Sequence, residues 1–212
     1  MISKRPSVIH TVAAVLPLLA LLLLTCRSAA AGHSSPAEVT RTFNEALLEA
    51  MKKADELGYS GRYRLLEPVI AKTYALSFMT AQSTGRYWKT FPKDEQAKAI
   101  KAYADWTTAT YAGRFDGYSG EKFEVTSAGK PRQGIVTVIS RLIKPNGEEV
   151  SFHYLLRDID GSWRIVDIRI SGVSQLALTR AQFTAVIRAE GTKGLIGMLD
   201  EKIRGFEKGA KE

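Results

Sequence analysis

Residues 149–170 read EVSFHYLLRDIDGSWRIVDIRI, and this stretch determines the fold class. Apolar and polar residues alternate through 149–157 and again through 162–170, which is the period of a β-strand. The link between the two runs contains Asp160-Gly161, a pair that favours the tight turn of a hairpin. The stretch therefore predicts two consecutive antiparallel strands.

Two further strands precede this pair, at residues 122–127 and 134–143, and Asn146-Gly147 lies in the turn that leads into the third strand. Helical spacing of apolar residues is found in the segments 36–57, 62–70, 76–83, 92–111, 176–190 and 193–206. Ser34 or Ser35 caps the first helix, and Gly58 ends it before a loop at 59–61. The pattern predicts an α+β fold: N-terminal helices, a four-stranded, mainly antiparallel curved sheet, then C-terminal helices.

Residues 1–31 have the three parts of a cleavable secretory signal. Lys4-Arg5 precedes an apolar run at 11–25, and small residues follow up to Ala31. The run is shorter than the ~20 residues that a membrane-spanning helix needs, and Pro17 interrupts it. We therefore expect export and cleavage after Ala31, with a retained anchor as the alternative, and a single domain at residues 32–212.

The charge and the cysteine content of the chain indicate which partners it can bind and how it is stabilised. The formal net charge is +8, and three of the basic residues lie in the predicted signal, which leaves +5 for the domain. No basic tract or nucleic-acid-binding motif is present, which argues against nucleic acid as a partner. Cys26 is the only cysteine and would leave with the signal, so stability must come from a packed core. Lipidation of Cys26 is disfavoured because Thr25, rather than Gly or Ala, precedes it.

Catalytic and metal-binding motifs are missing from the sequence. It contains no Gly-Xaa-Ser-Xaa-Gly elbow, phosphate loop or dinucleotide fingerprint, and its histidines and cysteine form no metal-binding pattern. We therefore predict no metal, no cofactor and no catalytic residue. Asp167, a carboxylate within an apolar strand, is expected to pair with an arginine such as Arg180; a catalytic role is the alternative.

One face of the strand at 149–157 is apolar, through Val150, Phe152, Tyr154 and Leu156. Helices that pack directly on such a face form an ordinary closed core. If the helices stand off the sheet, the same side chains line an apolar pocket. The pattern leaves both possibilities open.

Several segments resemble the MlaC family of periplasmic lipid-binding proteins, also called toluene-tolerance auxiliary components. They are 154–157, 160–168, 171–174, 179–183 with its Arg-x-x-Phe pattern, and 191–202. Within that family, the segments 61–63, 66–70 and 114–123 are most similar to the hopanoid-biosynthesis-associated HpnM group. The resemblance rests on the order and spacing of these segments and covers nearly the whole predicted domain.

The resemblance implies a non-enzymatic periplasmic carrier that shuttles phospholipid or hopanoid between the two membranes. Its implied partners are an inner-membrane ABC transporter complex and an outer-membrane lipoprotein and porin complex. It also favours the pocket over the closed core, with lipid-binding side chains expected at Val150, Phe152, Tyr154, Leu156, Ile135, Ile139, Trp106 and Phe183. The alternatives are an NTF2-like enzyme on the same sheet, an isomerase or lipid-modifying enzyme, and a transporter subunit that binds no lipid.

Overall fold

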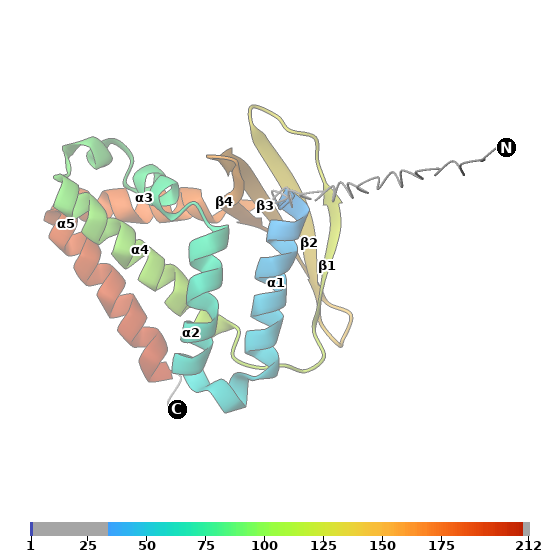
Figure 1. The fold of residues 1–212 in the computed structure, drawn as a ribbon. Helices are drawn as coiled ribbons and strands as arrows, with labels where there is room; N and C mark the ends of the chain where they lie inside the picture. The colour runs from blue at the N-terminus through green and yellow to red at the C-terminus, as the bar shows by residue number, and fades with distance from the viewer. Residues whose placement is uncertain (2–33, 210–212) are drawn as a thin grey trace. The chain divides into compact units, whose positions relative to one another are not determined.

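An antiparallel sheet with strand order β1-β2-β3-β4-β5 forms one layer of the fold (Figure 1). The computed structural model describes Met1 and residues 34–209; the rest of the predicted signal therefore lies outside the described residues. The strands are β1 (Lys122–Ala128), β2 (Ile135–Ile143), β3 (Glu149–Ile159), β4 (Ser162–Ile170) and β5 (Val173–Ser174). The predicted α+β class and antiparallel meander are confirmed, with β5 as a short addition.

Helices precede and follow the sheet in the expected order. They are α1 (Pro36–Lys52), α2 (Ala54–Thr73), α3 (Leu76–Thr84), the 3-10 helix η1 (Gly85–Thr90), α4 (Lys93–Arg114) and α5 (Gln175–Gly209). All of them belong to one unit of residues 33–212. Within the described part of the chain, no helix combines the length and apolarity needed to span a bilayer.

The helix boundaries follow local capping chemistry. Ser35 caps α1 through a reciprocal pair of hydrogen bonds with Glu38, with Pro36 in the first turn. The helix predicted at 36–57 is divided in two: α1 ends at Lys52, the chain turns through Lys53, and α2 begins at Ala54. The predicted break at Gly58 is present, with φ of 55°, but the predicted loop at 59–61 is helical.

The hairpin between β3 and β4 has the turn that the sequence predicts. Asp160 and Gly161 have φ of 52° and 78°, and a type I′ turn requires positive φ at both central residues. Beyond the turn, a β-bulge interrupts β4: Leu156 pairs with Ile165, Leu155 pairs with Asp167, and the register skips Val166. The extra residue places Ile165 in the same row as Ile168, which strict alternation would not allow.

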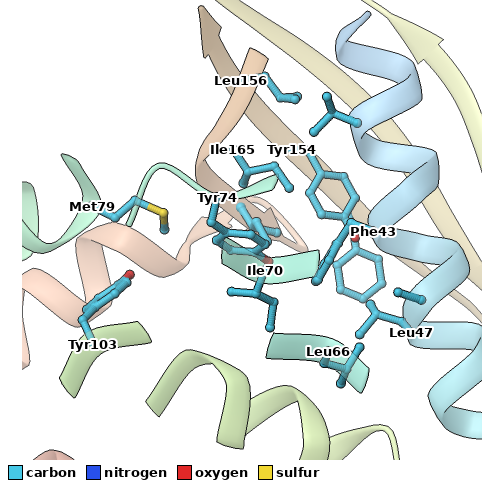
Figure 2. Packing of buried hydrophobic residues seen from close by; sticks show 14 of the residues in the cluster. Phe43, Leu47, Leu66, Ile70, Tyr74, Met79, Tyr103, Tyr154, Leu156 and Ile165 are labelled. Atoms are coloured by element: carbon cyan, nitrogen blue, oxygen red, sulfur yellow. The ribbon is translucent and has the colours of Figure 1, made fainter. Parts of the chain in front are cut away.

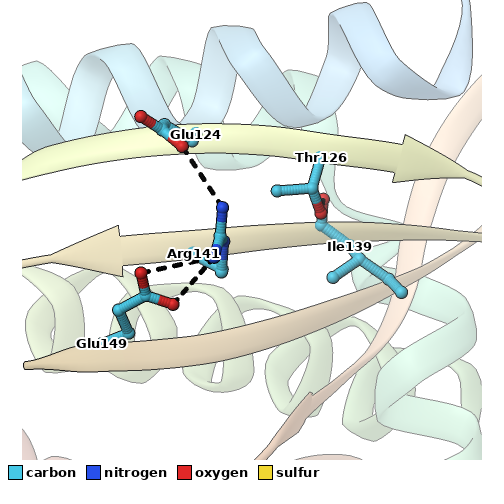
Figure 3. A network of polar contacts seen from close by, with 5 residues as sticks. All are labelled: Glu124, Thr126, Ile139, Arg141 and Glu149. Atoms are coloured by element: carbon cyan, nitrogen blue, oxygen red, sulfur yellow. Dashed lines mark hydrogen bonds and ion pairs between the residues drawn. The ribbon is translucent and has the colours of Figure 1, made fainter.

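The outer face of the sheet is polar and partly exposed. Ile139 pairs with His153 and Ile135 with Arg157, so both isoleucines lie on the face opposite to Phe152 and Tyr154. Their row continues to Arg141, which forms ion pairs of 3.4 Å with Glu124 and 2.9 Å with Glu149 (Figure 3). The placement of Ile135 and Ile139 on the pocket face was therefore wrong. The row that shares that face contains Val136, Val138, Ser140 and Leu142.

Helix α1 packs against the inner face of the sheet. Phe43 makes edge contacts with Tyr74, Tyr111 and Tyr154, at centroid distances of 5.1, 5.0 and 6.1 Å. Asn44 donates to Ser140 Oγ at 2.8 Å and accepts from the Tyr154 hydroxyl at 2.8 Å, which satisfies three buried polar groups. Figure 2 shows this core, with the rings of Phe43 and Tyr154 next to each other.

Arg62 of α2 is buried and joins two helices. Its guanidinium donates to the carbonyl of Ala54 at 3.0 Å and to that of Ala112 at 2.9 Å. Ala112 lies in the last turn of α4, where backbone carbonyls lack helical partners and attract positive charge. Arg62 thus fixes the angle between the start of α2 and the end of α4.

We predict that Arg62→Met destabilises the protein by about 2–4 kcal/mol, because two buried carbonyls lose their donors. Urea unfolding followed by circular dichroism measures the change. Arg64→Met, an exposed position on the same helix, is the matched control and should change stability by less than about 0.5 kcal/mol. Equal effects of the two substitutions would contradict the assignment.

Candidate functional site

A cavity of about 600 Å³ lies between the helices and the inner face of the sheet. This volume falls within the usual range of ligand-binding pockets. Helix α4 supplies much of one wall, β2, β3 and β4 supply another, and the first turn of α5 closes a third side. The apolar and aromatic lining residues are Met51, Tyr74, Met79, Tyr103, Trp106, Tyr111, Phe115, Leu142, Phe152, Ile168, Ile170 and Leu176.

Contacts between α4 and α5 hold these two helices together beside the sheet. Phe183 of α5 is fully buried and packs against Tyr103 and Trp106 of α4, with ring centroids 6.0 and 5.8 Å apart. Further along, Gly113 lies so close to Phe206 that a Cβ atom there would clash with its ring. These contacts bury apolar side chains between α4 and α5. They do not fill the space between these helices and the inner face of the sheet.

Asp167 fixes the beginning of α5 at the edge of the cavity. Its carboxylate accepts the Leu176 backbone N–H at 3.0 Å and the Ser174 hydroxyl at 2.7 Å. A carboxylate at the N-terminus of a helix is favoured by the exposed N–H groups and by the helix dipole. The expected partnership with Arg180 is therefore wrong: Asp167 serves as a cap, and Arg180 lies against Gly85.

Threonines in the wall have satisfied hydroxyl groups. Thr107, Thr110 and Thr179 each donate to a carbonyl one turn back in their own helix, at 2.7, 2.8 and 2.8 Å. These hydroxyl groups are hydrogen-bonded before any ligand enters, so they need no hydrogen bond from the ligand. The wall is consequently suited to apolar ligand groups.

Tyrosine hydroxyls give the interior its remaining polarity. Tyr74 donates to the Tyr111 hydroxyl at 2.7 Å. Burial raises the pKa of Tyr111 to about 12 and holds the pKa of Tyr74 well above its usual range. Burial also raises the pKa of Tyr103. The phenols that line the cavity are therefore neutral at physiological pH and offer hydrogen bonds without charge.

Charged residues gather where the cavity meets solvent. The rim is formed by the end of α4, the segment 115–121 and the end of β2, and its charged residues are Arg114, Asp116, Glu121 and Lys144. Arg114 and Asp116 are exposed, whereas Glu121 and Lys144 are half-buried. The Ser119 backbone N–H donates to Glu121 at 2.6 Å and lowers the pKa of that carboxyl. The rim thus presents both signs of charge around an apolar interior.

Only part of the predicted lipid-binding set lines this cavity. Trp106 and Phe152 do. Tyr154, Leu156 and Phe183 are buried in the adjoining core, and Val150 is half-buried on the same row as Phe152. Ile135 and Ile139 lie on the outer face, as described above. In the described chain, no group of three or more histidine, cysteine or carboxylate side chains is arranged to hold a metal.

Sequence reasoning missed most of the wall that α4 provides. Tyr103, Thr107, Thr110 and Tyr111 accompany Trp106 in the helical stripe of this segment, but a stripe of that kind is equally typical of a core helix. No sequence pattern indicated that Tyr74 lines the cavity, since this residue lies in the short link between α2 and α3. Its position depends on a backbone bridge to Ile165 of β4.

Comparisons with known proteins agree with this fold. A family model described as MlaC protein matches residues 41–201. Among solved structures, the chain is similar to a phospholipid-binding protein from Ralstonia solanacearum, solved in complex with a phospholipid. The TM-score is 0.72 at 21% identity, over 82% of this chain and 99% of that one. A search of curated proteins returned no significant match.

The raised pKa of Tyr111 predicts a loss of stability at alkaline pH. A folded-state pKa above the unfolded value of about 10 means that its contribution is complete below pH 10 and is lost as the pH rises towards 12. The difference in unfolding free energy between the wild type and Tyr111→Phe should therefore fall by up to about 1.4 kcal/mol per pH unit above pH 10. Urea unfolding at a series of pH values measures it; a constant difference would contradict the burial of this phenol.

Proposed function

Since the chain belongs to the MlaC family, we propose that it is a periplasmic lipid carrier that shuttles phospholipid or hopanoid between the inner and outer membranes. It would act as the auxiliary component of an inner-membrane ABC transporter and meet a lipoprotein and porin complex at the outer membrane. Export through the predicted signal at residues 1–31 and release as a domain of residues 32–212 belong to the same proposal.

The cavity is the observation that carries this proposal. Its apolar wall removes acyl chains from water, which is worth about 25 cal/mol per Å² of apolar surface. Because the wall threonines already donate within their helices, entry of an acyl chain leaves none of those hydroxyl groups without a partner. The phospholipid bound to the Ralstonia protein, which shares this fold, supports the same ligand class.

The charged rim favours phospholipid over hopanoid as cargo. Arg114 suits a phosphate group, and Lys144 would suit one if it exchanged its ion pair with Glu148 at 3.0 Å for the ligand. Asp116 and Glu121 suit an amine, if the headgroup remains at the rim while the chains enter the cavity. An uncharged ring system would use the apolar wall but would gain nothing from these four side chains. The preference follows from charge complementarity rather than from volume.

The candidate acid and base groups have other roles, which favours binding over catalysis. Asp167 caps α5, and His153 lies on the outer face of the sheet, opposite Ile139 of β2 and Arg169 of β4. Asp160 lies in the β3–β4 turn. The titratable groups deepest in the cavity are phenols with raised pKa values, which neither donate nor accept a proton readily near neutral pH.

We predict that Phe152→Asp reduces the lipid that co-purifies with the protein at least tenfold, because it introduces a charge into the apolar wall. Native mass spectrometry of the purified protein, together with lipid extraction, measures occupancy. Ile139→Asp is the matched control: it places the same charge on the neighbouring strand but on the outer face, and should leave occupancy unchanged.

A second variant guards against a folding defect in Phe152→Asp. Thr110→Trp fills part of the cavity without adding a charge, and should lower lipid occupancy while preserving the circular dichroism spectrum. If both cavity variants folded and retained lipid at the wild-type level, the cavity would not be the cargo site. Wild-type protein that takes up no lipid from phospholipid vesicles would overturn the carrier proposal itself.

A further inference from the structure

A second concave site lies outside the lipid cavity, between η1 and the first half of α5. It has a volume of about 330 Å³, and its charged lining residues are Arg86, Arg180 and Arg188. Ala181 and Ala185 are small and, with Thr184, line the same pocket on the α5 side. The lining thus combines guanidinium groups with side chains too short to fill the space between them.

The local charge is uniformly positive. Residues 85–90 and 175–189 contain Arg86, Lys89, Arg180 and Arg188 but no aspartate or glutamate. The ion pairs found within residues 34–209 involve Arg141 and several lysines, and none of these three arginines. None of the residues that line the pocket carries a carboxylate, and the nearest acidic residue along α5 is Glu190, beyond Arg188.

Two of the guanidinium groups are already positioned. Arg86 stacks over the Tyr87 ring at 5.1 Å and donates to its hydroxyl at 3.1 Å. Arg180 lies against Gly85, where a Cβ atom would be only 3.3 Å from Nη2. Ordering these side chains before binding reduces the entropy that an anion would have to offset, and the planar guanidinium matches the geometry of a phosphate.

Exposed apolar side chains lie beside the arginines. Leu178 is 55% exposed, and Val173, just before α5, is 49% exposed. Leu178, Ala181 and Ala185 are spaced by three and four residues, so they share one exposed face of α5. Basic residues next to exposed apolar ones are typical of surfaces that rest on a lipid interface, where phosphates and acyl chains are both within reach.

We propose that the arginine pocket, formed by Arg86, Arg180 and Arg188, binds the phosphate of a lipid headgroup in a membrane and docks the first half of α5 on the bilayer surface. The site is separate from the cargo cavity, to which α5 contributes Gln175, Leu176 and Thr179 instead. Docking therefore does not require that the cavity hold lipid.

Vesicle co-sedimentation tests the proposal with the domain of residues 32–212, which lacks the apolar run at 11–25 and contains the compact unit of residues 33–212. Vesicles of phosphatidylcholine containing phosphatidylglycerol should bind the wild type at low ionic strength, and added salt should weaken binding. The triple variant R86A/R180A/R188A should bind about 100-fold more weakly, since each basic residue near an anionic surface contributes several-fold. The control K130A/R132A/R204A removes the same charge from exposed positions elsewhere and should stay within about threefold of the wild type.

Three further measurements distinguish a lipid surface from a soluble anion, an acidic protein or the cargo itself. Leu178→Ser should weaken vesicle binding, because the proposed contact includes apolar surface. Phe152→Asp should still bind vesicles, which distinguishes docking from cargo uptake. Inorganic phosphate and polyglutamate, tested by calorimetry, should bind much more weakly than the vesicles.

Three results would overturn the proposal. Equal losses in the two triple variants would mean that total charge, and not the pocket, attracts the membrane. Wild-type protein that ignores the vesicles but binds inorganic phosphate would make the pocket a site for a soluble anion. Wild-type protein that ignores the vesicles but binds polyglutamate, with loss in R86A/R180A/R188A, would make it a site for an acidic protein.

Discussion

Tyr74 connects the elements that surround the cavity. Its backbone bridges to Ile165 of β4, and the next residue donates its N–H to the Ile165 carbonyl at 2.9 Å. Its ring packs against Phe43 of α1, and its hydroxyl donates to Tyr111 of α4. In Figure 2, Tyr74 lies between the closed core around Phe43 and the side of the cavity marked by Met79 and Tyr103. Tyr74 therefore ties the sheet, α1 and α4 together on one side of the cavity.

The elements predicted best from the sequence are those whose conformation depends on residues close together in the chain. The β3–β4 hairpin needed only Asp160-Gly161 and two alternating runs, because both turn residues must adopt positive φ. The face of β2 was assigned wrongly because both of its rows contain branched apolar residues, and a shift of one residue exchanges the faces. Arg141 could have decided the assignment: it shares a row with Ile139 and forms ion pairs on the outer face, so that row faces solvent. The bulge at Val166 left no sequence signal, so the position of Ile165 was beyond pattern reasoning.

The cavity was foreseen from family resemblance and not from pattern. Its wall comes from α1, α3, α4, α5, three strands, the link before α3 and the segment 115–121, so it depends on contacts between residues far apart in the chain. Periodicity reports which face of an element is apolar but not the distance to the next element. That distance is set by Phe183 packing on Trp106, by the close approach of Gly113 to Phe206, and by the Asp167 cap of α5. Each is an ordinary stabilising contact: the first two hold α4 and α5 together, and the third ties the beginning of α5 to β4.

The size of the cavity has an energetic consequence for any carrier built this way. Residual cavity in a protein core costs about 24 cal/mol per Å³, so a dry, empty space of about 600 Å³ would cost about 14 kcal/mol. The net stability of a domain is only about 5–15 kcal/mol, so such a space must be filled or must contract. Water entering past the rim would reduce the cost, but along the helical wall it would meet threonine hydroxyls that already donate within their helices. An acyl chain meets the requirement fully, so the cargo of a carrier with this wall acts as part of its core. Release is then favourable only where water or another lipid can take its place as it leaves.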